Sequence, residues 1–193
     1  DSTSNTSNKK RLNLPGLRDA NYAGHSNRKE KTTLFVVEGD SALGMIKRMI
    51  TEYGLGRDYN ATFNLRGVPP NTRHHIKMIK GKEGKLVPVR DNTYDSDKNK
   101  LKTLVDVLGL DYNKQYNSVE EIKQARYDRL VIAVDQDVDG VGNIMSLVLN
   151  HIERLFPGLF KNGFVYHMRT PLIRAFPKNK KDTIKEFYSE LSY

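Results

Sequence analysis

The chain has 193 residues, of which 37% are hydrophobic, so it can bury a core of its own and does not have the composition of a disordered protein. Its 32 Lys and Arg outnumber its 23 Asp and Glu, and the resulting formal charge of +9 mildly favours a polyanionic partner such as nucleic acid. Cysteine is absent, which excludes disulfides and thiolate metal sites. No apolar run approaches the ~20 residues that span a bilayer, and no signal peptide opens the chain. We therefore expect an intracellular protein with no membrane partner.

The N-terminal part predicts a lead-in followed by a strand and a helix. Residues 1–10 are small and polar without periodicity, which predicts a flexible lead-in, and residues 11–31 predict an ordered but irregular approach segment. The β-branched and aromatic run TTLFVV, residues 32–37, predicts a buried strand. After the EGDS turn, Ser41 is expected to cap an amphipathic helix, because apolar residues then recur at helical spacing.

The middle of the chain predicts a second strand, an excursion and a second helix. NATFNLRG reads as a strand that ends at Gly67, and the two prolines of VPPNTRHH forbid an immediate helix. Residues 77–100, which include KGKEGK, are rich in Lys, Gly, Asp and Asn and predict a long surface excursion. NKLKTLVDVLGL resumes helical periodicity and is expected to stop at Gly109.

The C-terminal part completes an alternation of strands and helices. RLVIAV predicts a third strand, GNIMSLVLNHIERLF an amphipathic helix ended by PG, and GFVYHMRTPLIRAF one or two further strands. KNKKDTIKEFYSELSY predicts a loop and the start of a helix, so residues 177–193 are expected to be a junction to a downstream domain. The pattern predicts an α/β domain, residues 32–176, with a mostly parallel central sheet flanked by helices.

Acidic residues follow two of the predicted strands. Glu38 follows FVV, and Asp135, Asp137 and Asp139 follow IAV at alternate positions. In an extended backbone the three aspartates leave on one side, where carboxylates ~5 Å apart repel by roughly 3 kcal/mol at an effective dielectric of ~20. If the two strands are parallel neighbours, Glu38 meets the aspartates at one sheet edge. An all-oxygen cluster suits a hard cation, so we expect Mg²⁺, which supports phosphoryl transfer.

Two simpler readings compete with this one. DxDxDG also resembles the start of a calcium-binding loop, but such a loop needs a glutamate at its twelfth position, where this chain has Ser146. EGDS alone is compatible with an ordinary turn before a helix. The pairing of both motifs, each after a β-run, favours the metal site.

The motifs together resemble a known family. EGDS after one strand and DxDxDG after a later one resemble the Toprim signature of topoisomerases, bacterial-type primases and some nucleases. LPGLRDANYAG, NLRGVPPNTR, LGLDYNKQY, FPGLF and GFVYHMRTPLIRAF follow the order seen in type IIA DNA topoisomerases, most like the eukaryotic, viral or large-phage forms. The resemblance covers roughly residues 11–176 and implies the Rossmann-like Toprim fold.

The resemblance also implies roles for individual residues. Glu38 matches a glutamate that binds metal and is proposed to act as general acid or base at the leaving 3′ oxygen. Asp135 matches the aspartate shared between up to two Mg²⁺ ions, Asp137 the one that completes the second site, and Asp139 the third acid of the network. The resemblance further implies that Arg66 and Asn71 lie beside the DNA backbone, and Arg66 is also counted among the catalytic residues. Arg73 is a candidate for a substitute DNA contact.

Two departures from the family pattern bear on these roles. The lysine expected after LRG is replaced by Val68, so Arg73, His74, His75 or Lys77 would have to supply the missing DNA contact. After DVDG this chain has VGNI, one residue longer than the usual segment and without its histidine. All four acidic positions are nevertheless present.

The resemblance implies a part of a larger ATP-dependent enzyme that passes one DNA duplex through another. The nucleophilic tyrosine of that enzyme lies in a winged-helix region and its ATP site in an N-terminal region. Neither region is recognised here, so none of the tyrosines is assigned as the nucleophile. The five histidines are expected to be structural. The implied partners are double-stranded DNA, those other regions of the enzyme, and further subunits in a homodimer or heteromeric complex. Localisation would be nuclear in a eukaryote, or in host cytoplasm or nucleus for a virus. The alternatives are a Toprim primase or nuclease and a non-catalytic DNA-binding scaffold.

Overall fold

A computed structural model of the chain describes residues 12–27, 30–81, 84, 86–92, 94–96, 99–134, 138–169, 173–176 and 185–187; for 138–141, 173–175 and 187 it describes the backbone alone. A five-stranded sheet forms the centre, with strand order β1-β3-β2-β6-β7. All neighbours in it are parallel except β1, which runs antiparallel to β3. The predicted α/β fold with a mostly parallel sheet is therefore confirmed. The strands are β1 (Leu17–Arg18), β2 (Thr33–Val37), β3 (Asn60–Asn64), β6 (Arg129–Ala133) and β7 (Val165–His167).

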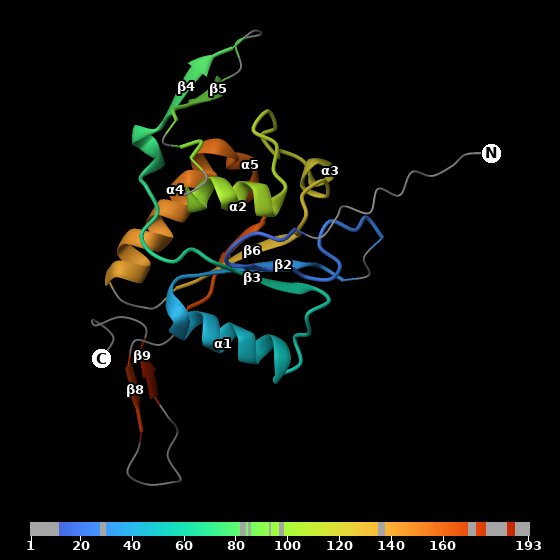
Figure 1. Cartoon of the computed structure of the whole chain (residues 1–193), viewed down its shortest axis with the longest axis vertical. Helices are drawn as coiled ribbons and strands as arrows, with labels where there is room; N and C mark the ends of the chain where they lie inside the picture. The colour runs from blue at the N-terminus through green and yellow to red at the C-terminus, as the bar shows by residue number, and fades with distance from the viewer. Residues whose placement is uncertain are drawn as a thin grey trace, which may run out of the picture.

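Helices cover both faces of this sheet (Figure 1). Helix α1 packs on one face, where Phe35 and Val37 of β2 meet Ala42, Ile46 and Ile50. The larger core fills the other face and contains the apolar side of α2 together with α4 and α5. Because β2 is buried on both faces, all five of its residues are apolar or threonine, as expected of a central parallel strand. The helices are α1 (Gly39–Thr51), α2 (Lys100–Leu108), α3 (Val119–Ile122), α4 (Ser146–Leu155) and α5 (Pro157–Lys161).

The structure moves two predicted helix boundaries. Helix α1 begins at Gly39 with Glu38 as its N-cap, so Ser41 lies inside the first turn and is not the cap. Gly39 has φ +78, and this left-handed conformation lets the chain turn directly from β2 into the helix. Helix α4 ends at Leu155, and Pro157 then starts α5, where its missing N–H costs nothing. The prediction for α2 is confirmed, since Gly109 ends it with φ +66.

Two hairpins lie outside the main sheet. Strands β4 (Ile76–Lys80) and β5 (Leu86–Arg90) pair antiparallel within the segment that was predicted to be a surface excursion, and they project from the domain. The predicted helix start near the C-terminus is wrong at residues 185–187, because β9 (Lys185–Phe187) pairs antiparallel with β8 (Ile173–Ala175). In both places ladder hydrogen bonds to a partner strand override the local sequence preference.

The PG dipeptide that begins α5 makes a testable packing prediction. A Cβ on Gly158 would lie 2.2 Å from the Tyr116 carbonyl oxygen and 2.4 Å from that of Gln115, which are backbone atoms that cannot swing aside. We therefore expect Gly158→Ala to lower the free energy of unfolding by about 1–3 kcal/mol or more, measured by urea denaturation. Gly44→Ala is the matched control, because its Cβ meets nothing within 4 Å inside α1; it should stabilise by about 0.5–1 kcal/mol. Equal effects of the two changes would contradict the packing argument.

Candidate metal centre and nucleic-acid interface

Three parallel strands end side by side at the edge that carries the predicted site. In register, Val37 of β2 lies opposite Asn64 of β3 on one flank and Ala133 of β6 on the other. The Leu65 N–H donates to the Val37 carbonyl at 3.0 Å, which keeps the first of these pairs together past the strand end. The condition set from the sequence, that β2 and β6 be parallel neighbours, is met. Glu38 thus leaves β2 between the ends of β3 and β6.

Glu38 has the environment that a metal ligand needs. It is partly exposed, its backbone is extended (φ −123, ψ 131), and its side chain does not cap α1. Within the part of the chain that the structure describes, its carboxylate makes no hydrogen bond or ion pair. A partly exposed carboxylate at a strand end fits a hard, oxygen-preferring cation such as Mg²⁺.

The three predicted aspartate ligands are not described with their side chains. Asp135 and Asp137 are outside the described residues, and for Asp139 only the backbone is described, in the π-helical turn η3 (Val138–Met145) that leads into α4. Val134, just before them, is buried at 2% exposure beside the end of β2. Among the described residues no three His, Asp or Glu side chains form a metal-binding group. The geometry therefore fits Glu38 to the site and leaves the aspartates as predictions.

Arg66 lies at the same edge in an unusual backbone conformation. It has φ +50, uncommon for a residue with a side chain, and Gly67 follows with φ +101. The Asn64 Oδ1 accepts a hydrogen bond from the Arg66 N–H at 3.0 Å and so holds this turn. The exposed Arg66 side chain is thereby anchored beside the strand end that adjoins Glu38. Such a held, left-handed residue is typical of functional loops.

Asn71 and Arg73 lie apart from the strand ends, in the short 3₁₀ helix η1 (Thr72–His74). Asn71 caps this helix by accepting from the Arg73 N–H at 3.1 Å. The Arg73 Nε donates to Asn150 Oδ1 on α4 at 3.3 Å, so one face of its guanidinium is tied to the helix. Both side chains are exposed, which is compatible with a backbone contact but does not bring them to Glu38.

The histidines and tyrosines occupy structural positions. His75 Nδ1 lies 3.0 Å from Asp91 Oδ2, and His151 is fully buried against the ring of Tyr94. Tyr22 stacks on Tyr59 with ring centroids 5.1 Å apart. These contacts agree with the structural and packing roles expected from the sequence.

A buried charged network was missed by sequence reasoning. Asp19 of the approach segment accepts hydrogen bonds from the Arg126 Nη2 at 2.5 Å, from the Tyr127 hydroxyl, and from the Leu12 N–H at 3.1 Å. The side chains of Asp19 and Arg126 are 2% and 5% exposed. Burial and the neighbouring Asp19 carboxylate raise the pKa of Tyr127 above its usual range. The network locks the segment before β2 onto the turn before β6, 107 residues away.

The sequence profile of the Toprim domain matches residues 33–170, which is most of the chain. The chain belongs to the Toprim family. The matched range begins at β2 and extends past β7, so it contains the strand ends that carry Glu38, Arg66 and the DxDxDG motif.

The relatives of this Toprim chain carry the name DNA topoisomerase 2. It is 33% identical to the protein of African swine fever virus over 98% of its length, 33% to that of Caenorhabditis elegans over 98%, and 35% to that of Bombyx mori over 91%. The structure is similar to the DNA-binding, cleavage and re-ligation domain of Plasmodium falciparum topoisomerase II, with a TM-score of 0.72 and 27% identity over 95% of this chain. The resemblance to type IIA topoisomerases is thus confirmed.

This Toprim chain spans a small part of those proteins. It covers 16% of the viral relative, 11% of the nematode relative and 22% of the Plasmodium structure.

None of the helices in the described ranges combines the length and the apolar character that crossing a bilayer requires.

Proposed function

We propose that this chain is the Mg²⁺-binding part of a type II DNA topoisomerase, which cleaves and religates duplex DNA so that a second duplex can pass in an ATP-dependent cycle. The observation that carries the proposal is the parallel register of β2 and β6, because Glu38 directly follows β2 and Asp135 follows β6 in sequence. The names of the relatives support the same reading. Residues 32–176 are taken as the Toprim domain and 177–193 as its junction.

Each of the four acidic residues has a role in this proposal. Mg²⁺, when bound, would offset the negative charge that develops on the oxygens of the scissile phosphate. Glu38 and Asp135 would hold it, Asp135 would be shared with a second ion whose site Asp137 completes, and Asp139 would help hold the network. Glu38 would also exchange a proton with the leaving 3′ oxygen, and its side chain is not used to cap α1.

The proposed DNA contacts and partners follow from the same reading. The anchored turn of Arg66 would present its guanidinium to a backbone phosphate, with Asn71 and Arg73 as further contacts. The nucleophilic tyrosine and the ATP site would be supplied by other regions of a longer, dimeric or heteromeric enzyme. Its site of action would be intracellular: the nucleus in a eukaryote, or the host cytoplasm or nucleus for a virus.

A magnesium titration tests the metal site directly. In ¹⁵N-labelled chain, millimolar Mg²⁺ should shift the amide resonances of Glu38 and of residues 135–139, because a bound divalent charge changes their shielding. Glu38→Gln and Asp137→Asn should each remove the shifts. Glu52→Gln is the matched control, because it neutralises an exposed carboxylate at the other end of the same helix and should leave them intact. Identical titrations for all the variants would refute the site.

The enzyme and scaffold readings differ in the complete protein. There, Glu38→Ala should abolish Mg²⁺- and ATP-dependent relaxation of supercoiled DNA while DNA binding survives, because the carboxylate takes part in the chemistry and not in the docking. Undiminished relaxation would favour the scaffold. A primase or nuclease reading has no support from the relatives found.

A further inference from the structure

A hollow opens on the α1 face of the sheet, at the edge formed by β1. Strand register puts Arg18 of β1 and Phe35 of β2 on the same face as Thr62 of β3, which lies between them. Phe35 packs against α1, whereas a space remains between α1 and β1. The space left between them is a cavity of about 240 Å³. Its polar lining comes from β1, α1, β3 and the turn after β3, and we call it the β1 groove: Arg18, Lys47, Thr62, Asn64 and Arg66.

The β1 groove concentrates positive charge without a compensating acid. Arg18, Lys47 and Arg66 line it from β1, α1 and the turn after β3, and no Asp or Glu among the described residues lines it. Within the described ranges none of the three side chains makes an ion pair. A smaller adjoining hollow of about 20 Å³ shares Arg18 and Lys47 and adds Arg57.

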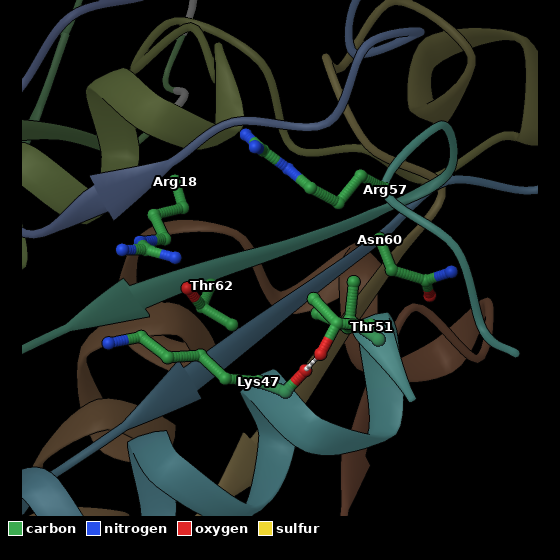
Figure 2. Close-up of a pocket in the computed structure, with 7 residues that line it drawn as sticks. Arg18, Lys47, Thr51, Arg57, Asn60 and Thr62 are labelled. Atoms are coloured by element: carbon green, nitrogen blue, oxygen red, sulfur yellow. Dashed lines mark hydrogen bonds between the residues drawn. The ribbon is translucent and has the colours of Figure 1, made fainter. Parts of the chain in front are cut away.

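Two of the cationic side chains flank Thr62. Figure 2 shows the guanidinium of Arg18 and the extended side chain of Lys47 on either side of Thr62, with Arg57 reaching over from the loop before β3. The acids next to Arg18 and Arg57 in sequence are already engaged: Asp19 bonds Arg126, and Asp58 accepts from the Asn21 amide at 2.6 Å. The cations are therefore available to an anion from outside the described part of the chain.

Two buried polar groups on the floor of the groove lack partners. Thr62 and Asn64 are each 2% exposed, yet the Thr62 Oγ1 and the Asn64 Nδ2 have no hydrogen-bond partner among the described residues. The Asn64 Oδ1 is used by the Arg66 N–H, so its amide nitrogen is the group left to donate. Buried donors without partners are rare because they cost free energy unless a ligand or water accepts from them. Two donors beneath three cations match the oxygens of one phosphate.

We propose that the β1 groove binds a phosphodiester of the DNA backbone, without a metal ion. This rests on the proposed function for the identity of the DNA. The cavity is smaller than the ~300 Å³ lower bound of typical small-molecule pockets and no aromatic side chain lines it, so it suits one phosphate and offers nothing on which a base could stack. Arg66 belongs both to the groove and to the strand-end site, so a DNA strand held at the metal centre continues onto the groove.

A DNA-binding measurement in excess EDTA tests the groove without the metal site. Fluorescence anisotropy of a short labelled duplex gives the affinity over a range of salt concentrations. Arg18→Gln and Lys47→Gln should each weaken binding and reduce the slope of log affinity against log salt by about one, since each removes one phosphate contact. Thr62→Val should weaken binding about 2–10-fold with the slope unchanged, because it removes an uncharged hydrogen bond. Lys123→Gln and Lys161→Gln, at exposed sites outside the groove, are the charge-matched controls.

A titration with inorganic phosphate is the second part of the test. It should shift the amide resonances of Thr62 and Asn64 saturably in the wild-type chain and not in Lys47→Gln. If phosphate binds but the groove variants weaken DNA no more than the controls, the DNA assignment is overturned. If neither ligand responds to the variants, with thermal unfolding showing all of them folded, the groove proposal fails. The Mg²⁺ titration at Glu38 is independent of these results, so a failure of the metal site is distinguishable.

Discussion

Replacing Asp19 with alanine is expected to lower the free energy of unfolding by about 3–5 kcal/mol, because it leaves the buried Arg126 guanidinium without its carboxylate. The Tyr127 hydroxyl and the Leu12 N–H lose their acceptor at the same time. The effect reaches beyond one contact, since Asp19 belongs to the segment before β2 and Arg126 to the turn before β6. Urea denaturation followed by circular dichroism measures the loss.

An exposed ion pair provides the control for Asp19. Asp95 lies 3.2 Å from the Arg90 Nε, with side chains 47% and 31% exposed. Because solvent screens this pair, Asp95→Ala should cost no more than about 1 kcal/mol. Comparable losses for the two variants would show that burial of the Asp19 network contributes little.

The second large effect is a dependence of stability on pH that comes from His151. Burial lowers the pKa of His151 to about 3 in the folded chain, whereas an unfolded histidine titrates near ~6.5. Between these values the unfolded state binds a proton that the folded state does not, so stability falls as the pH falls from about 6.5 towards 3. At about pH 4 the loss from this single group is of the order of 3 kcal/mol.

His151→Phe isolates this contribution. The phenyl ring keeps an aromatic contact with Tyr94, whose ring lies 5.7 Å from that of His151, and cannot take up a proton. The difference in unfolding free energy between about pH 7.5 and pH 4 should shrink by about 3 kcal/mol in the variant. Carboxylates titrate alike in both proteins and cancel in the comparison, and the value at the higher pH reports any packing cost of the ring. An unchanged pH difference would contradict a neutral, buried His151.

The sequence predicted the central sheet well because its strands are local and strongly patterned. TTLFVV and RLVIAV are short apolar runs followed by acidic residues, and Gly109 marks the left-handed end of α2. The parallel register that brings Glu38 to the end of β6 could be stated only as a condition, because pairing between distant strands leaves no local signal.

Features made by distant partners escaped prediction. Asp19 reads as one more charge in LPGLRDANYAG, and only the fold shows that it meets Arg126. The β1 groove likewise draws its cations from separate elements, so no run of basic residues marks it. The β8–β9 pair was missed for the same reason, since KEF has no strong strand preference until Ile173–Ala175 lies beside it. The positions of Asp135 and Asp137 lie outside the described residues and stay predictions.

The π-helical turn over Val138–Met145 has a consequence for how this chain tolerates changes in length. In a regular α-helix one inserted residue rotates everything after it by ~100°, which would swing the buried face of α4 away from the core. A π turn bonds five residues back and so takes up one residue more per turn. The VGNI segment, residues 141–144, lies within this turn, and Val148, Ile152 and Leu155 of α4 share a buried face after it. A change of one residue in the length of this turn is therefore expected to leave the buried face of α4 in phase with the core.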